Sequence, residues 1–166
     1  QHDSLTQLPN RMLLHDRLTQ AIAAARRHRQ SLAVLFLDVD RFKHTNDSLG
    51  HAVGDQLLQS IARRLVTCVR KSDTVSRLGG DEFAAILPRV SSIDDASAVA
   101  RKLLLSMQEP FLIRGHAISV GISIGIALYP DNNLTAEDLI RCADMAMYQV
   151  KAHGKNGALA FQPDMH

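Results

Sequence analysis

One apolar run, LAVLFLDVD at residues 32–40, constrains the fold of this chain more than any other feature. A strand with one face in water alternates apolar and polar residues, whereas this run stays apolar until Asp38. A continuous run of this kind is typical of a strand that is buried on both faces. We therefore expect it to lie inside a sheet that helices cover on both sides.

Helices that can cover such a sheet are predicted by the spacing of other apolar residues. These side chains recur every three or four positions, which places them on one face of a helix. The four predicted helices span residues 10–28, 55–70, 93–107 and 136–152.

A second long strand is predicted at residues 116–130, where bulky residues alternate with small ones. The small residues are Ser119, Gly121, Ser123, Gly125 and Ala127. One face of this strand is therefore nearly bare, and we expect a helix to approach it closely.

A β-hairpin is predicted around the sequence GGDE at residues 79–82. Short strands at residues 74–78 and 83–87 flank it, and its two glycines allow a tight turn. A last short strand is expected at residues 158–161. Because helices alternate with strands and the hairpin adds an antiparallel pair, we predict an α/β fold of the α+β type, with a mixed central β-sheet flanked by helices.

Length and composition limit the class of protein. A chain of 166 residues with 46% hydrophobic residues fits one globular domain. The formal net charge of +2 gives no strong electrostatic case for binding nucleic acid or a membrane. Cys68 and Cys142 lack metal-ligand spacing, and no apolar run approaches the roughly 18 residues of a membrane span, which favours a reduced, cytoplasmic domain. Because the chain starts at Gln1, we expect residues 1–166 to be a single domain from a longer protein, whose parent could be membrane-anchored.

Acidic residues stand at the ends of two predicted strands. Asp38 and Asp40 end the first strand, and Asp81 and Glu82 lie at the tip of the hairpin. If these strands are neighbours, the carboxylates converge, repel one another and raise each other's pKa. A divalent cation relieves this repulsion, and oxygen ligands favour Mg²⁺ or Mn²⁺ over zinc.

The two glycines of the hairpin fit the same interpretation. Gly79 and Gly80 leave the backbone bare, so that phosphate oxygens can approach its N–H groups. The alternative is that the glycines only form the turn and that the acids at the strand ends are merely solvated.

Four sequence blocks, in order and over almost the whole chain, resemble the GGDEF domain family, the diguanylate cyclases. RLGGDEF at residues 77–83 is similar to the family signature. DSLTQLPNR at 3–11 resembles the opening motif, with Gln7 in place of a usual glycine. Between these two blocks lies LDVDRFKHTND followed by LGHAVGD, at residues 37–55, and the last block along the chain is ADMAMYQVKAHGKN at residues 143–156.

This resemblance implies a palm-like nucleotide cyclase architecture in which the β-hairpin carries the signature. It also implies a reaction, the condensation of two GTP molecules into cyclic di-GMP with release of pyrophosphate. A 3′-hydroxyl would attack an α-phosphate with the help of Mg²⁺ or Mn²⁺. Because one site binds one nucleotide, two domains would face each other across a twofold axis in a transient homodimer.

The resemblance also assigns roles to residues at the acidic sites. Asp38 and Asp81 would ligate the metal together with the backbone carbonyl of Val39. Asp81 and Glu82 would be the catalytic residues, with Glu82 beside the reacting 3′-hydroxyl.

Other residues would bind GTP. Asn46 and Asp55 would read guanine, whose Watson–Crick edge offers N1–H and N2–H donors to their acceptors. The residues near the phosphates would be Lys43, Lys151, Lys155, Gly79 and Gly80. Lys155 replaces a common family arginine, so a point charge stands in for a bidentate fork.

These polar residues also have structural interpretations. Lys151 and Lys155 lie near a helix C-terminus, where the helix dipole favours cations. Asn46 could end the short helix that follows Lys43, and Asp55 could cap the next helix.

RKSD at residues 70–73 resembles the RxxD site at which the family binds its own product. Arg70 and Asp73 would then hold cyclic di-GMP and mediate feedback inhibition. Arg101 falls where a second product-binding arginine is often found. The alternative for Arg70 and Asp73 is an ordinary salt bridge after a helix.

Two other functions stay open. FQPDMH at residues 161–166 resembles the segment that links a GGDEF domain to an EAL phosphodiesterase domain, and a sensory domain is expected upstream. In that setting the domain could bind GTP or cyclic di-GMP without turnover and regulate its EAL neighbour. The other alternative is a metal-dependent nucleotidyltransferase of different specificity, although no basic, aromatic-lined groove for a nucleic-acid strand is evident.

Overall fold

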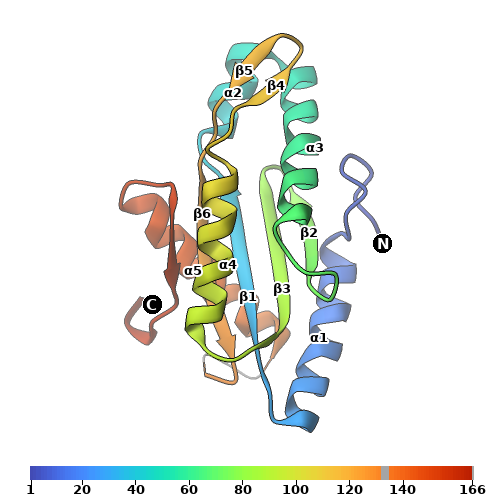
Figure 1. The fold of residues 1–166 in the computed structure, drawn as a ribbon, viewed down its shortest axis with the longest axis vertical. Coiled ribbons are helices and arrows are strands. Elements are labelled where there is room, and N and C mark those ends of the chain that lie inside the picture. Colours follow the sequence, from blue (N-terminus) through green and yellow to red (C-terminus); the bar gives the residue numbers. More distant parts are fainter. Residues whose placement is uncertain (132–134, 166) are drawn as a thin grey trace.

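The computed structural model describes residues 1–131 and 135–165 (Figure 1). The helices are α1 Arg11–His28, α2 Phe42–Leu49, α3 His51–Thr67, α4 Ile93–Ser106 and α5 Ala136–Ala152. The strands are β1 Ser31–Val39, β2 Thr74–Gly79, β3 Glu82–Val90, β4 Phe111–Ile113, β5 His116–Ile118, β6 Ile122–Tyr129 and β7 Gly157–Ala160. A short 3-10 turn, Pro163–Met165, follows β7.

The main sheet has five strands in the order β2-β3-β1-β6-β7. Its central strand β1 pairs antiparallel with β3 and β6, while β6 and β7 are parallel, so the sheet is mixed. In β1, every residue except the half-buried Ser31 and Asp38 is buried, as expected for a strand covered on both faces. The predicted fold class is confirmed.

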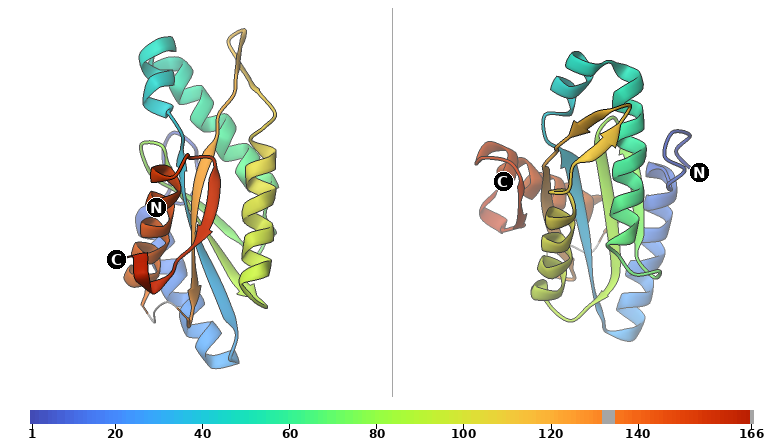
Figure 2. Two further views of the ribbon diagram at one scale, coloured as in Figure 1. Left: turned by 90° about the vertical axis from the view of Figure 1, so that its left-hand side faces the viewer. Right: turned by 45° about the horizontal axis from the view of Figure 1, so that its top comes forward.

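Two layers of helices cover the sheet. One face carries α1 and α5, whose apolar residues form one core cluster with alternate residues of β1. The other face carries α3 and α4, which form the second cluster. Figure 2 shows the sheet between these two helix pairs.

Helix α5 packs directly on the bare face of β6, as predicted. A Cβ atom at Gly125 would collide with the backbone of Ala143 and Met147 in α5. The small residues of β6 therefore set how closely the helix lies against the sheet.

The prediction of one strand over residues 116–130 is wrong. The segment forms two strands in different sheets, because β5 pairs with β4 in a separate hairpin and β6 pairs with β1. Residues 119–121 lie between them, and the carbonyl of Gly121 accepts a hydrogen bond of 2.9 Å from the Asp40 amide. The alternation of bulky and small residues continues across the break, so the sequence pattern does not reveal a change of partner strand.

The helix expected at 55–70 begins earlier and ends earlier, at His51 and Thr67. Gly50, with φ 91°, separates it from α2. Asp55 therefore lies inside α3 and does not cap it, and Asn46 lies within α2 rather than ending it. Both structural interpretations of these residues are thus wrong.

Among the described helices, none has the length and apolar character needed to cross a membrane.

Candidate functional site

The end of β1 and the turn between β2 and β3 bring three acidic residues together. Asp38 lies opposite Glu82 in the antiparallel register of β1 and β3. The amide of the next residue, Val39, donates a 3.1 Å hydrogen bond to the carbonyl of Asp81. The expected convergence of the two acidic groups is therefore present, on adjacent strands of one sheet.

Within this acidic cluster, Asp38 is the residue whose pKa is raised to about 7. Burial, together with hydrogen bonding to and repulsion by the Asp81 carboxyl, raises the pKa of Asp38 to about 7. Oδ1 of Asp38 is buried and has no hydrogen-bond partner among the described residues. Ionised carboxylates only accept hydrogen bonds, so Asp81 cannot supply the missing donor unless one of the two is protonated.

The second acid, Glu82, is also perturbed. Burial raises the pKa of Glu82, and the negative charges of Asp144 and Asp81 add to this effect. Arg11, the first residue of α1, opposes the shift by favouring the charged form. Glu82 therefore holds a proton more readily than an ordinary surface carboxyl.

The acidic cluster fits a divalent cation with few protein ligands. In the described part of the chain, no three side chains of His, Cys, Asp or Glu are arranged to hold a metal. Two carboxylates and one carbonyl are nevertheless the kind of partial set that Mg²⁺ accepts when phosphates and water complete its coordination. The orphaned Oδ1 of Asp38 is the atom that such an ion would satisfy.

Lys151, in the last turn of α5, lies against the acids at the end of β1. Its Nζ is 3.6 Å from Oδ2 of Asp38 and 3.3 Å from Oδ1 of Asp40. Only 22% of its side chain is exposed. The structure therefore places this lysine at the edge of the acidic cluster.

Asp40 has a different environment from Asp38, which the sequence did not reveal. Its buried carboxylate accepts hydrogen bonds of 2.6 Å from the Ser123 hydroxyl and 2.9 Å from the Asn156 amide. With Lys151, these contacts tie β1, β6 and the turn after α5 together. The signal that could have identified it is Ser123, a small polar residue on the helix-facing side of β6.

The two predicted guanine-binding residues lie on consecutive helices. Asn46 is half-buried in α2, and Asp55 is exposed in α3. Oδ1 of Asn46 is buried and lacks a hydrogen-bond partner within residues 1–131 and 135–165. The asparagine amide lies against Gly54, the residue before Asp55.

The remaining predicted phosphate contacts are all solvent-exposed. Lys43 lies in the first turn of α2, and Lys155 lies in the turn after α5 with φ 65°. Gly79 and Gly80, at the hairpin tip, have φ 142° and 49°, in the range of positive φ that favours glycine. In Figure 1, this tip, the end of β1 and α2 lie toward the same end of the sheet.

The predicted product-binding pair forms a local ion pair. Nη2 of Arg70 is 3.4 Å from Oδ1 of Asp73 and donates a 3.0 Å hydrogen bond to the carbonyl of Arg89. The Asp73 side chain is 1% exposed, whereas 62% of the Arg70 side chain is exposed. The ordinary salt bridge expected as an alternative is therefore present, with the guanidinium at the surface.

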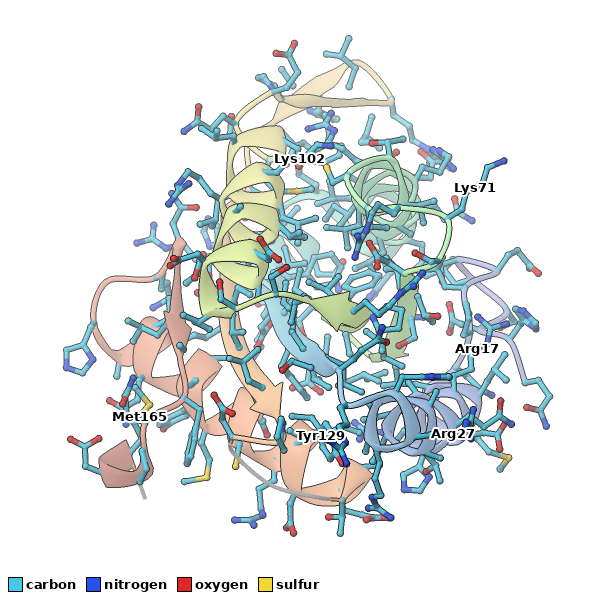
Figure 3. All side chains as sticks on the ribbon, turned by 60° about the horizontal axis from the view of Figure 1, so that its bottom comes forward. Arg17, Arg27, Lys71, Lys102, Tyr129 and Met165 are labelled. Carbon is cyan, nitrogen blue, oxygen red and sulfur yellow. The ribbon has the colours of Figure 1, made fainter. Side chains whose placement is uncertain are left out.

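A cavity of about 390 Å³ adjoins this ion pair. Arg70, Asp73 and Lys102 contribute to its wall, whereas Arg101 does not line it. Lys71, between the two members of the pair in sequence, points away into solvent (Figure 3). The structure thus places Lys102, not Arg101, beside Arg70.

A clamp between the N-terminal segment and the hairpin tip was missed by the sequence analysis. The guanidinium of Arg77 donates hydrogen bonds of 3.1 and 2.7 Å to the carbonyl of Gly80, and its Nη1 lies 3.0 Å from Oδ1 of Asp3. Both side chains are largely buried, at 14% and 17% exposure. The available signal was that Asp3 lies in the opening motif and Arg77 in the signature block.

Comparisons with known proteins agree on one family. Residues 1–157 match the family described as "Diguanylate cyclase, GGDEF domain". The chain is 47% identical over 165 residues to the bifunctional diguanylate cyclase/cyclic di-GMP phosphodiesterase MucR of Pseudomonas aeruginosa. It is 50% identical over 155 residues to the diguanylate cyclase TpbB of the same species.

The chain covers only part of these relatives. The match to MucR takes in 99% of the chain but 24% of MucR, and the match to TpbB takes in 93% of the chain but 36% of TpbB.

A solved structure of the GGDEF domain of TpbB from Pseudomonas aeruginosa has the same fold. It superposes with a TM-score of 0.97 at 46% identity, and the match covers 99% of this chain and 96% of that one.

Proposed function

This chain belongs to the GGDEF domain family of diguanylate cyclases, and on that premise we propose that it condenses two molecules of GTP into cyclic di-GMP. In each of the two steps, the 3′-oxygen of one GTP forms a bond to the α-phosphorus of the other, and the bond to pyrophosphate breaks. One observation carries the proposal. Asp38, with an unpartnered buried oxygen among the described residues, lies on the strand next to Asp81 and Glu82.

Asp38 and Asp81 would hold Mg²⁺ or Mn²⁺, with the carbonyl of Val39 as a further ligand. When bound, the ion would neutralise the phosphate charge that grows as pyrophosphate leaves. It would also offset the repulsion by Asp81, which adds to the effect of burial in raising the pKa of Asp38.

Glu82 would act on the attacking hydroxyl. A general base works best when its pKa approaches the working pH, and burial already raises the pKa of Glu82. Its carboxylate would accept the 3′-hydroxyl proton as the new P–O bond forms.

Recognition of GTP would be divided between the two ends of the nucleotide. Asn46 and Asp55 would accept hydrogen bonds from the N–H donors of guanine, which adenine does not offer in that arrangement. Lys43, Lys151 and Lys155 would pair with the β- and γ-phosphates. The bare turn at Gly79 and Gly80 would let those phosphates approach backbone N–H groups.

The ion pair of Arg70 and Asp73 would bind the product and inhibit the reaction. Its support is the buried Asp73 carboxylate, which orients an exposed guanidinium beside a cavity of about 390 Å³. The concentration of cyclic di-GMP that halves the rate should then be at least tenfold higher for Arg70→Ala than for the wild type. An unchanged inhibition constant would reject this site.

The parent protein would add domains to this one. MucR is named as both a cyclase and a phosphodiesterase, and a similar parent would carry an EAL domain after residue 166 and a sensory domain before residue 1. The domain itself would work in the cytoplasm as a transient homodimer.

The proposed function is tested by incubating the domain with GTP and Mg²⁺ and measuring cyclic di-GMP. The Asp81→Ala, Glu82→Ala double variant should lose the product, whereas Asp16→Asn, an exposed control on α1, should retain it. GTP binding without any product from the wild type would instead favour a regulatory module that controls an EAL neighbour.

A further inference from the structure

We propose that Gly54 is a positioning residue for base recognition. Because glycine has no side chain, the Asn46 amide fits against position 54. In this position its oxygen can accept a hydrogen bond from the amino group of a purine. The inference rests on the proposed function, because it requires that Asn46 contacts the guanine of GTP.

The geometry places Gly54 directly beneath the Asn46 side chain. Helices α2 and α3 are joined at Gly50 and pack against each other, so that Gly54, in the first turn of α3, faces α2. A Cβ at position 54 would overlap Oδ1 of Asn46 and lie 2.8 Å from its Cγ. The next nearest atom, Cζ of Phe42, would be 3.3 Å away. A side chain at position 54 would therefore displace the amide before anything else.

The backbone does not require glycine at this position. Gly54 does not have a positive φ, and it lies within the regular helix α3. A glycine inside a helix is less stable than alanine by about 0.5–1 kcal/mol. An alanine at position 54 would not fit, because the Asn46 amide occupies the place of its Cβ.

That polar group is itself unsatisfied. Oδ1 of Asn46 is buried without a hydrogen-bond partner in the described part of the chain. A buried acceptor without a donor costs about 1–3 kcal/mol, which a ligand that brings an N–H group would recover. The amino group at C2 of guanine is such a donor, and hypoxanthine lacks it.

Packing offers a competing explanation for Gly54. The approach of Phe42 at 3.3 Å is tight, so glycine could serve only to bring α2 and α3 together. The two explanations predict different results for Gly54→Ala when the Asn46 side chain is removed. A clash of the new Cβ with the Asn46 amide would then disappear, whereas a clash with Phe42 would remain.

The experiment measures binding of two triphosphates in the presence of Mg²⁺, both carrying a methylene between the α- and β-phosphates so that no turnover occurs. One contains guanine and the other hypoxanthine. The proteins are the wild type, Gly54→Ala, Asn46→Ala and the double variant. Gly157→Ala is the matched control, since a Cβ there would meet its nearest atom at an ordinary 3.6 Å.

The wild type and Gly157→Ala should prefer the guanine analogue about tenfold, the value of one hydrogen bond. Gly54→Ala should lose most of this preference, as Asn46→Ala does, and the double variant should be no worse than Asn46→Ala. In the Asn46→Ala background, Gly54→Ala should leave the melting temperature unchanged or raise it.

Two results would overturn the inference alone. One is a Gly54→Ala variant that keeps the wild-type preference for guanine. The other is a melting temperature that falls by the same amount with and without the Asn46 side chain, because the clash would then lie with Phe42. A wild type that binds neither triphosphate would instead overturn the proposed function, and this inference with it.

Discussion

Two carboxylates at the end of β1, two residues apart, have different surroundings. Burial and the neighbouring Asp81 raise the pKa of Asp38 to about 7, and although Lys151 lies 3.6 Å from its Oδ2, its Oδ1 has no hydrogen-bond partner among the described residues. Asp40 instead accepts hydrogen bonds from a hydroxyl and a backbone amide and pairs with the Lys151 ammonium group. The first is an unsatisfied group that a cation can use, and the second is a satisfied one that holds the structure. Residue type and spacing alone predicted the same environment for both.

Asp40→Ala should therefore destabilise the fold. The change removes the partner of Ser123, of the Asn156 amide and of Lys151, and leaves these donors with too few acceptors. We expect the free energy of unfolding to fall by about 3 kcal/mol, measured by urea denaturation. Asp47→Ala, at an exposed position in α2, should change it by less than about 0.5 kcal/mol. Equal midpoints for Asp40→Ala and the wild type would contradict this role.

The raised pKa of Asp38 predicts how stability depends on pH in the metal-free protein. The folded pKa of about 7 lies above the ordinary value of 3.8, so the folded state binds the proton more tightly than the unfolded one. The stabilisation is fully present below about pH 4 and is lost as the pH rises toward 7. In EDTA, the wild type should lose on the order of 2 kcal/mol more than Asp38→Asn between pH 4 and pH 8. Parallel stability curves for the two proteins would show that Asp38 does not titrate in this way.

At the scale of helices and strands, prediction succeeded where burial alone decided the pattern. The continuous run of β1 and the alternation around Gly125 both report which faces are covered, and both were confirmed. The break at residues 119–121 was missed because bulky and small residues alternate through it, although β5 and β6 pair with different strands. The start of α3 was missed because Gly50 separates two helices without any change in polarity.

The close contact of α5 and β6 can be tested by Gly125→Ala. The added Cβ would meet backbone atoms of Ala143 and Met147, which cannot rotate away as a side chain can. We expect a loss of about 1–3 kcal/mol in thermal or urea unfolding, as for other overpacked cores. Gly157→Ala, in the adjacent parallel strand β7, should be close to neutral. If both variants unfold at the same point as the wild type, the helix does not lie as close as described.

The candidate site, like the fold, was predicted in part from the sequence. The convergence of Asp38 and Asp81 followed from the acidic ends of two neighbouring strands. The contact of Arg77 with Asp3 was not predicted, since it joins residues 74 positions apart in the sequence. The contact between Asn46 and Gly54 depends on how α2 packs against α3, and the spacing of apolar residues does not specify this packing.

At the scale of the whole molecule, the proposed product sets the assembly. Cyclic di-GMP has two identical halves, and the proposed site binds one GTP, so ring closure would need two domains in a twofold arrangement. The rate per chain should therefore rise in proportion to protein concentration while the domain is mostly monomeric. Initial rates over a hundredfold range of concentration provide the measurement.

A matched control is the same domain fused at its N-terminus to a parallel dimeric coiled coil. The fusion supplies a high effective concentration, so its rate per chain should be independent of dilution. An unfused domain with the same rate per chain at every concentration would contradict a two-domain reaction.

The central claim is that Asp38 and Asp81 together hold a divalent ion that carries the triphosphate of GTP. Its most direct test is Mn²⁺ binding, measured by electron paramagnetic resonance of the free ion, in the presence of the guanine analogue with a methylene between its α- and β-phosphates. The account predicts that Asp38→Asn and Asp81→Asn each weaken binding at least tenfold, while Asp16→Asn binds like the wild type. Wild-type affinity in both of the first two variants would contradict it.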